Sequence, residues 1–77
     1  NIGKGAADGL VLAPMNGRVL DVAISVGDTV KRGQNLLTLE AMKMEHEINA
    51  RMDGVVKKVT PKTGDQVASR SLLVEIE

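Results

Sequence analysis

Apolar residues occur in short runs along the chain, and turn-forming residues separate one run from the next. Residues 19–24 and 36–39 form two such runs in the first half of the chain, and residues 55–59 and 72–76 form two in the second half. Short runs that are rich in branched residues and bounded by glycine are typical of β-strands. The pattern therefore predicts an all-β chain.

The second half of the chain repeats the first. Residues 13–40 align without a gap on residues 50–77. The identical pairs are Ala13 and Ala50, Met15 and Met52, Gly17 and Gly54, Val19 and Val56, Val22 and Val59, Gly27 and Gly64, Asp28 and Asp65, Val30 and Val67, Leu36 and Leu73, and Glu40 and Glu77. Two copies are too few for a solenoid. They predict a domain with pseudo-two-fold symmetry, in which each half covers the apolar face of the other.

The spacing of apolar residues departs from a flat strand at one place in each copy. Val19 and Val22 are three residues apart, as are Val56 and Val59, whereas side chains on one face of a flat strand recur every second residue. We therefore expect a β-bulge, or a strand that changes sheets, at this position.

Glycine and aspartate recur at the same places in both copies and are interpreted as turn residues. They are Gly17, Gly27, Asp28, Gly54, Gly64 and Asp65. Since the two aspartates have this local role, they are not interpreted as a catalytic acid and base.

Many short strands joined by regular turns favour a small sandwich or flattened barrel. The chain has no Phe, Tyr or Trp, so its core must be built from Val, Leu, Ile, Met and Ala. Met15 and Met52 are related by the repeat and are expected in that core. Residues 1–9 are small, polar and rich in glycine, and we expect a flexible linker there, followed by one domain over residues 10–77.

The stretch between the two copies is ambiguous by local rules. Glu40, Ala41, Met42, Lys43, Met44 and Glu45 are all residues that favour a helix, and on propensity alone a helix would cover residues 37–48. The repeat contradicts that interpretation, because residues 36–40 match residues 73–77, which alternate as a strand does. What remains is too short for an independent helix, so a tight hairpin fits better.

This hairpin would have unfavourable residues at its centre. A two-residue hairpin turn prefers Asn-Gly or Asp-Gly, because φ is positive at both central positions, and here the centre is Met42-Lys43. A local rule broken at one place in a consistent sequence indicates function. The two-fold symmetry also places the hairpin and the chain termini at opposite ends of the domain, so Lys43 should point away from the linker.

Composition excludes several function classes. The formal net charge is zero and there is no basic run, which argues against a nucleic-acid binder, and without aromatic residues there is no base-stacking surface. No apolar run is long enough to span a membrane, and no cysteine is present. His46 is the only histidine and no second metal ligand stands out beside it, so a metal site is not expected. A stand-alone enzyme is the least favoured class, since no catalytic constellation is visible.

At Ala41-Met42-Lys43-Met44 the chain resembles the biotinyl domains of biotin-dependent carboxylases and decarboxylases. The resemblance covers residues 10–77. It implies a biotinyl/lipoyl-like barrel-sandwich hybrid of two four-stranded halves, with biotin joined as an amide to Lys43. The domain would be a non-catalytic carrier, in which biotin is carboxylated by a biotin carboxylase and delivers the carboxyl group to a carboxyltransferase acting on an acyl-CoA or a 2-oxo acid.

The resemblance also implies partners and roles. A biotin protein ligase would install the cofactor, with Met42 and Met44 as flanking recognition residues, and with Ala41, Glu40 and Glu45 as candidate ligase contacts. Biotin carboxylase and carboxyltransferase domains or subunits would be the further partners. The domain itself is expected to be monomeric, without nucleic-acid or membrane partners.

Within this family the chain looks most like the C-terminal domain of an acyl-CoA carboxylase biotin-containing subunit, with the methylcrotonoyl-CoA type first and the propionyl-CoA, geranyl-CoA and pyruvate carboxylases behind it. That resemblance implies a cytoplasmic location, or the mitochondrial matrix in a eukaryote. The chain departs from the family at Arg70-Ser71, where a glycine often precedes the last strand. Two rival functions stay open: a lipoyl carrier with the same fold, and an unmodified barrel-sandwich interaction module.

Overall fold

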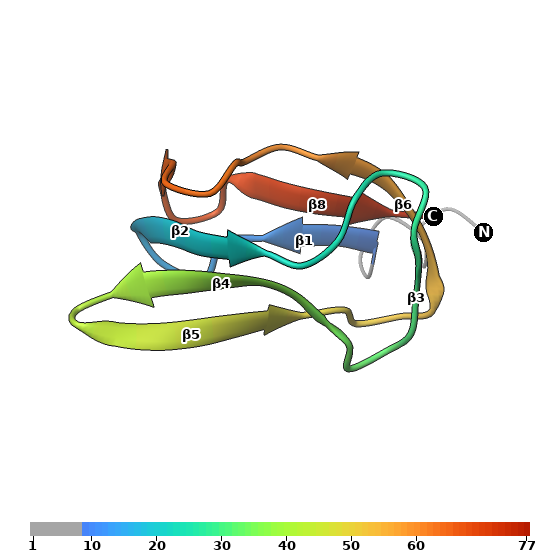
Figure 1. The fold of residues 1–77 in the computed structure, drawn as a ribbon, viewed down its shortest axis with the longest axis horizontal. Helices are drawn as coiled ribbons and strands as arrows, with labels where there is room; N and C mark the ends of the chain where they lie inside the picture. The colour runs from blue at the N-terminus through green and yellow to red at the C-terminus, as the bar shows by residue number, and fades with distance from the viewer. Residues whose placement is uncertain (1–8) are drawn as a thin grey trace.

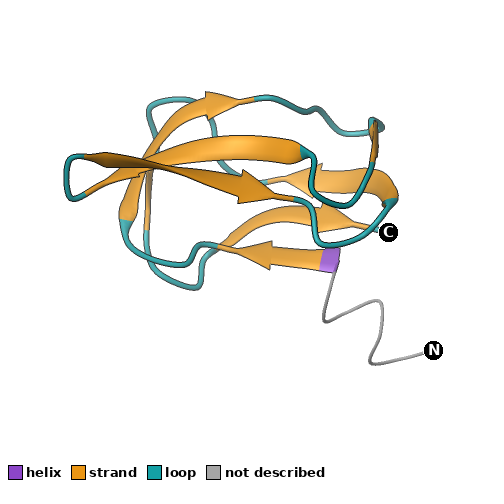
Figure 2. Cartoon of the chain, turned by 90° about the horizontal axis from the view of Figure 1, so that it is seen from below, coloured by secondary structure: helices purple, strands orange, loops and turns teal. Residues whose placement is uncertain are grey.

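The computed structural model describes residues 9–77 as two antiparallel sheets of four strands each (Figures 1 and 2). The strands are β1 (Leu10–Leu12), β2 (Gly17–Val22), β3 (Thr29–Val30), β4 (Asn35–Ala41), β5 (Met44–Asn49), β6 (Gly54–Val59), β7 (Gln66–Val67) and β8 (Leu72–Ile76). The all-β prediction and the two four-stranded halves are confirmed. The linker expected over residues 1–9 lies outside the described residues, apart from Gly9.

The order of strands in the two sheets shows the pseudo-two-fold symmetry directly. One sheet has the order β1-β8-β6-β3 and the other has the order β5-β4-β2-β7. By the sequence repeat, β8 is the counterpart of β4, β6 of β2 and β7 of β3, so the two orders correspond position by position. β3 follows β2 in the chain but pairs with β6, and β7 follows β6 but pairs with β2. If β1–β4 are taken as one half and β5–β8 as the other, each half therefore supplies both edge strands to the sheet whose two central strands belong to the other half.

The bulges expected from the apolar spacing are present in both copies. In the pairing of β2 with β4 the register shifts between Val19 and Asp21, and in the pairing of β6 with β8 it shifts between Val56 and Lys58. One extra residue in each strand bends the sheet locally. The bend lets β2 and β6 keep apolar residues in the core on both sides of the bulge.

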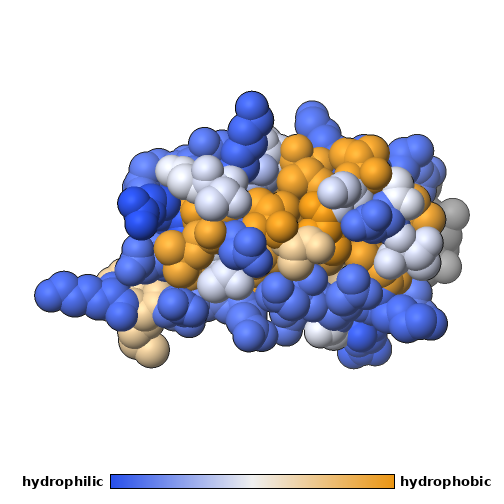
Figure 3. Space-filling model, in the orientation of Figure 1, coloured by the Kyte–Doolittle hydropathy of each residue, from blue (hydrophilic) through white to orange (hydrophobic). Residues whose placement is uncertain are grey.

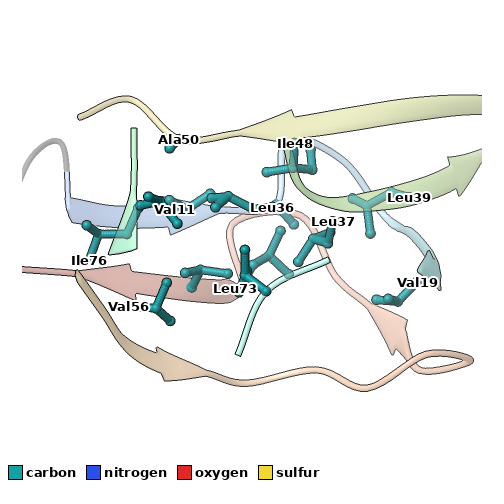
Figure 4. Packing of buried hydrophobic residues seen from close by; sticks show 14 residues of the cluster. Val11, Val19, Leu36, Leu37, Leu39, Ile48, Ala50, Val56, Leu73 and Ile76 are labelled. Carbon is teal, nitrogen blue, oxygen red and sulfur yellow. The ribbon is translucent and has the colours of Figure 1, made fainter. Parts of the chain in front are cut away.

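Buried apolar side chains fill the space between the two sheets (Figure 4). They come in pairs that the repeat relates: Val11 and Ile48, Ala13 and Ala50, Val19 and Val56, Leu36 and Leu73, Leu37 and Val74, and Leu39 and Ile76. No polar or charged residue is buried in the described part of the chain. The fold is therefore stabilised mainly by burial of apolar surface between halves, which contributes roughly 25 cal/mol per Å².

Backbone hydrogen bonds at the turns join the two halves with the same symmetry. The Gly27 N–H donates to the Val56 carbonyl at 2.8 Å, and the Gly64 N–H donates to the Val19 carbonyl at 2.7 Å. Both glycines have positive φ, as the turn requires. Neither half can satisfy these groups alone, so the halves must fold together.

The aspartates after these glycines close the turns, as predicted. The Asp28 carboxylate accepts a hydrogen bond from the Ser25 N–H, and the Asp65 carboxylate accepts one from the Lys62 N–H, both at 2.9 Å. Their carboxylates bond the backbone three residues earlier, which is a typical turn-stabilising contact.

The interpretation of Gly17 and Gly54 as turn residues is wrong. They begin β2 and β6, and their φ values are not positive. A Cβ at Gly17 would lie 2.8 Å from the Glu40 carbonyl oxygen, and a Cβ at Gly54 would lie 2.8 Å from the Glu77 carbonyl oxygen. Glycine is required there because two backbones approach closely, which is the other common reason for glycine in a strand.

The methionines that the repeat relates are less buried than expected. Met52 is half-buried and packs against the core cluster. Met15 is also half-buried but is not among the side chains that pack against that cluster. Both lie at the margin of the core rather than inside it, because the space between the sheets is filled by the branched residues of β2, β4, β6 and β8.

An exposed ion pair lies at the end of the domain that carries the C-terminus. The Lys57 ammonium lies 2.9 Å from the Glu77 carboxylate. This hydrogen bond raises the pKa of Lys57 and lowers the pKa of Glu77 from their ordinary values. Because both groups are exposed to solvent, water screens the attraction and its contribution to stability is small.

Arg70 adopts the backbone conformation that glycine has in the other half. Arg70 has φ 72°, and its repeat counterpart Gly33 has φ 90°. The Arg70 N–H donates to the Ala13 carbonyl at 2.7 Å, and the Gly33 N–H donates to the Ala50 carbonyl at 2.8 Å. The turn before the last strand therefore has the same backbone conformation as its counterpart, although it lacks the glycine. Arg70 must adopt a left-handed conformation there, which is unfavourable for a residue with a side chain.

Exchanging the residues at positions 33 and 70 tests how much the left-handed conformation of Arg70 destabilises the fold. We expect Arg70→Gly to raise the free energy of unfolding by about 0.5–1 kcal/mol, because relief of the left-handed penalty exceeds the extra freedom of glycine in the unfolded chain. The matched change Gly33→Arg should lower it by a similar amount. Urea unfolding followed by circular dichroism measures both variants, and equal stabilities would show that the left-handed conformation costs nothing here.

Candidate functional site

The stretch that joins the two halves is a two-residue hairpin turn between β4 and β5. Ala41 pairs with Met44 as the last rung, which leaves only Met42 and Lys43 in the turn. Their φ values are 55° and 66°, so both central residues are left-handed, as a type I′ turn requires. The hairpin and its unfavourable centre were predicted correctly, and the helix that propensity favours does not form.

β4 imposes this turn on the chain. It is hydrogen-bonded to β2 on one side and to β5 on the other, and Leu36, Leu37 and Leu39 on it are fully buried. Ala41, the last residue of β4, is 7% exposed, so its methyl group faces the core and anchors the strand up to the edge of the turn. Packing fixes β4, and β5 is paired with β4 as far as Met44, so only two residues remain to join the strands and they adopt the type I′ conformation.

The side chains of the turn point into solvent at one end of the long axis of the molecule. Met42 is 92% exposed and Met44 is 63% exposed, and Lys43 between them is also exposed. In Figure 1 this turn lies at the left, and the C-terminus and the start of β1 lie at the right. The expected separation of Lys43 from the chain end is therefore present in the described residues, and Figure 3 shows hydrophilic and weakly hydrophobic side chains projecting at that tip.

The exposure of the two methionines distinguishes them from core filler. A single exposed apolar side chain is common on a protein surface, but Met42 and Met44 lie on either side of the same exposed lysine and make the tip locally apolar. Lys43 forms no ion pair among the described residues. The tip thus presents an amine flanked by two soft apolar side chains.

A row of polar side chains crosses the sheet directly behind the turn. Glu45 on β5 pairs with Glu40 on β4, Glu40 pairs with Arg18 on β2, and Arg18 pairs with Gln66 on β7. Two carboxylates side by side repel each other, and Arg18, whose guanidinium lies 3.8 Å from the Glu40 carboxylate, offsets that repulsion. Glu40 and Glu45 therefore belong to one electrostatic group with Arg18.

Arg18 and Gln66 were not identified from the sequence. Together with Gly17, Glu40, Met42 and Lys43 they line a shallow depression of about 430 Å³ beside the turn. One signal could have found Arg18: its repeat counterpart is Val55, so the two halves differ in charge at this position. Gln66 has no such signal, because only the pairing of β7 with β2 brings it to the site.

Other chemistry is not supported by the described residues. No group of three or more histidine, aspartate or glutamate side chains that could hold a metal ion occurs within residues 9–77. His46 is half-buried on β5, opposite Leu39. Across the same residues, no helix is long and apolar enough to cross a membrane.

Fold and site together define a class: a two-fold symmetric β-domain that presents one exposed lysine on a strained hairpin. A family described as "Biotin-requiring enzyme" matches residues 10–76, and the chain belongs to this family. The family match implies attachment of biotin.

Carboxylases are among the similar sequences. The chain is 55% identical over 65 residues to pyruvate carboxylase of Staphylococcus aureus, covering 84% of this chain and 6% of that protein. It is 45% identical over 71 residues to mitochondrial methylcrotonoyl-CoA carboxylase subunit alpha of Mus musculus, covering 92% of this chain and 10% of that protein. The chain therefore spans a small part of the length of these relatives.

Solved structures of a carboxylase and of a lipoyl domain share the fold of this chain. Urea carboxylase of Kluyveromyces lactis superposes with a TM-score of 0.82 at 34% identity, covering 88% of this chain and 6% of that one. The lipoyl domain of the 2-oxoglutarate dehydrogenase complex of Azotobacter vinelandii superposes with a TM-score of 0.72 at 31% identity, covering 80% and 78%. The fold is thus shared by biotinyl and lipoyl domains, and the residues at the turn must distinguish them.

The strain in the turn gives a testable prediction. We expect Met42→Asn combined with Lys43→Gly to raise the free energy of unfolding by about 1–3 kcal/mol, because these residues adopt positive φ more readily. Lys43→Ala alone should leave stability nearly unchanged, since alanine has the same left-handed penalty and the lysine side chain makes no packing contact to lose. Urea unfolding compares the three proteins, and a large loss of stability in Lys43→Ala would mean that the turn is structural.

Proposed function

We propose that the chain is a biotin carboxyl carrier domain and that biotin is attached to the Nζ atom of Lys43. The observation that carries the proposal is the placement of Lys43: it is exposed at the tip of a left-handed turn, between Met42 and Met44, at the end of the domain opposite the chain end. A ligase active site can enclose such a tip without contacting the core. Membership of the biotin-requiring family supports biotin as the attached group.

The residues at the tip fit attachment of an acyl group. Attachment forms an amide between Nζ of Lys43 and the biotin carboxyl carbon and breaks the bond from that carbon to a leaving group, so the ligase must present biotin as an activated acyl group such as an acyl phosphate. The amine must lose its proton before it attacks. No side chain beside Lys43 in the described structure is placed as a base, so the proposal assigns that step to the ligase. Met42 and Met44 would give the ligase an apolar contact on each side of the amine, and Glu40 and Glu45 would give it charged contacts.

The domain positions the cofactor and does not itself catalyse the reaction. Bound biotin supplies a ring nitrogen that accepts a carboxyl group and passes it on. The chain contributes a rigid two-sheet body and an exposed tip, so the group on Lys43 can enter a biotin carboxylase site and then a carboxyltransferase site. The proposed acceptor is a 2-oxo acid or an acyl-CoA, because a pyruvate carboxylase and a methylcrotonoyl-CoA carboxylase are both similar to the chain.

The methylcrotonoyl-CoA type was the first choice from the sequence, and the comparisons do not single it out. The pyruvate carboxylase of Staphylococcus aureus has the higher identity, 55% against 45% for the mouse methylcrotonoyl-CoA subunit. We therefore leave both acceptor classes within the proposal. A cytoplasmic or mitochondrial-matrix location is part of the same proposal, on the ground that the mouse relative is mitochondrial.

A lipoyl carrier is the second candidate, because the lipoyl domain of Azotobacter vinelandii shares the fold with a TM-score of 0.72. The residues at the tip favour biotin. Lipoyl domains also have a central lysine, but Asp and Ala usually flank it, whereas Met42 and Met44 flank Lys43 in this chain. An unmodified interaction module would need no exposed amine at a strained turn.

Intact mass and peptide mapping test the attached group. After expression with a biotin protein ligase and biotin, we expect a mass increase that corresponds to one biotin, located on Lys43, and binding to streptavidin on a blot. Lys43→Arg keeps the positive charge but removes the amine to which biotin is attached. This variant should therefore show neither the added mass nor binding to streptavidin. Lipoate on Lys43, an unmodified chain, or a persistent signal in Lys43→Arg would each overturn the proposal.

Attachment should also change the charge of the domain. The Lys43 ammonium becomes a neutral amide, so the carboxylates of Glu40, Glu45 and Glu47 are less compensated. The isoelectric point of the biotin-bearing form should therefore be lower than that of the unmodified form. The Arg32→Gln variant of the unmodified domain loses one positive charge at another position and gives a reference for the size of this shift. Identical isoelectric focusing of the two forms would contradict attachment to a charged amine.

A further inference from the structure

The depression beside the turn has the polar groups of a small binding site. It is lined by Gly17, Arg18, Glu40, Met42, Lys43 and Gln66 and has a volume of about 430 Å³. Gly17 is buried and its backbone approaches the Glu40 carbonyl closely, so β2 and β4 lie close together at this place. Lys43 itself lines the rim, so a group attached to its amine would start next to the depression.

Arg18 and Glu40 lie side by side on β2 and β4 at the depression, without a hydrogen bond between their side chains. The guanidinium nitrogen lies 3.8 Å from the carboxylate oxygen, which is longer than a hydrogen bond, and the two side chains are 55% and 45% exposed. Donors on Arg18 and acceptors on Glu40 are therefore available to a third group. Gln66, paired with Arg18 across β2 and β7, adds an amide that can donate and accept.

We propose that this depression is a docking site for the ring head of the biotin carried on Lys43. The head of biotin is a cyclic urea, whose carbonyl oxygen accepts hydrogen bonds and whose N–H groups donate them. Arg18 and the Gln66 amide match the carbonyl, and the Glu40 carboxylate matches an N–H. Met42 supplies a thioether that can cover the apolar part of the ring, so the donors, acceptors and apolar surface of the site correspond to those of the ligand.

The chain that links Lys43 to the ring is long enough and flexible enough to fold back. The lysine side chain and the acyl chain of biotin consist largely of rotatable single bonds. A group held by a short flexible linker has an effective concentration on the order of millimolar, so even a weak site on the same domain is partly occupied. The head then exchanges between a docked state and a free state, and only the free state enters a partner enzyme.

The inference rests on the proposed attachment of biotin to Lys43, and nuclear magnetic resonance can test it separately. Amide chemical shifts of the ¹⁵N-labelled domain are compared before and after biotin attachment, with intact mass recorded for each sample. We expect shift changes at Gly17, Arg18 and Gln66 in addition to those at residues 41–45. A loaded domain whose shift changes stop at residues 41–45 overturns the docking alone, whereas absence of biotin in the mass spectrum counts against the attachment.

Two matched variants of the loaded domain sharpen the test. Arg18→Gln removes the main donor of the site and should abolish the remote shift changes, whereas Arg32→Gln, at the other end of the domain, should leave them intact. The rate of capture by avidin should rise about two-fold in Arg18→Gln if docked and free heads are equally populated in the wild type. Equal capture rates in the wild type and both variants would overturn the proposal.

Discussion

The feature on which the rest of this structure depends is the double anchoring of β4. This strand is hydrogen-bonded to β2 and β5, and its leucines are buried between the two sheets. Because the two strands are paired to their last residues, only Met42 and Lys43 remain for the turn, and both adopt positive φ although their residue types disfavour it. The core thus fixes a lysine in a conformation that its local sequence would not choose.

The pseudo-two-fold symmetry explains how so small a chain can do this without aromatic residues or disulfides. Most core residues of one half have a counterpart in the core of the other, and each half supplies two edge strands and turn hydrogen bonds to its partner. The two copies are not identical in charge. Arg18 of the first copy stands where the second copy has Val55, and Arg70 of the second copy stands where the first copy has Gly33. Each of these two departures places a positive charge in one copy that the other copy lacks.

The rigid body and the exposed tip suit a carrier better than a catalyst. No polar group is buried among the described residues, and the depression at the tip is shallow and open to solvent. A carrier needs only a defined tip and a stable body, since partner enzymes supply the enclosed sites where the chemistry takes place. The polar row of Glu45, Glu40, Arg18 and Gln66 behind the turn is where this chain can influence its own cargo between the two reactions.

The sequence by itself determined the all-β class and the bulges, because apolar spacing and turn residues act over short distances. It also determined the hairpin with Met42 and Lys43 at its centre, because the second half of the chain repeats the first and shows where each copy ends. Only the tertiary structure decided the roles of groups that meet across strands. It turned Ala41 toward the core, assigned Gly17 and Gly54 to close backbone approaches, and brought Gln66 to Arg18. The physical reason is that strand pairing depends on register between segments far apart in the chain, which local patterns do not encode.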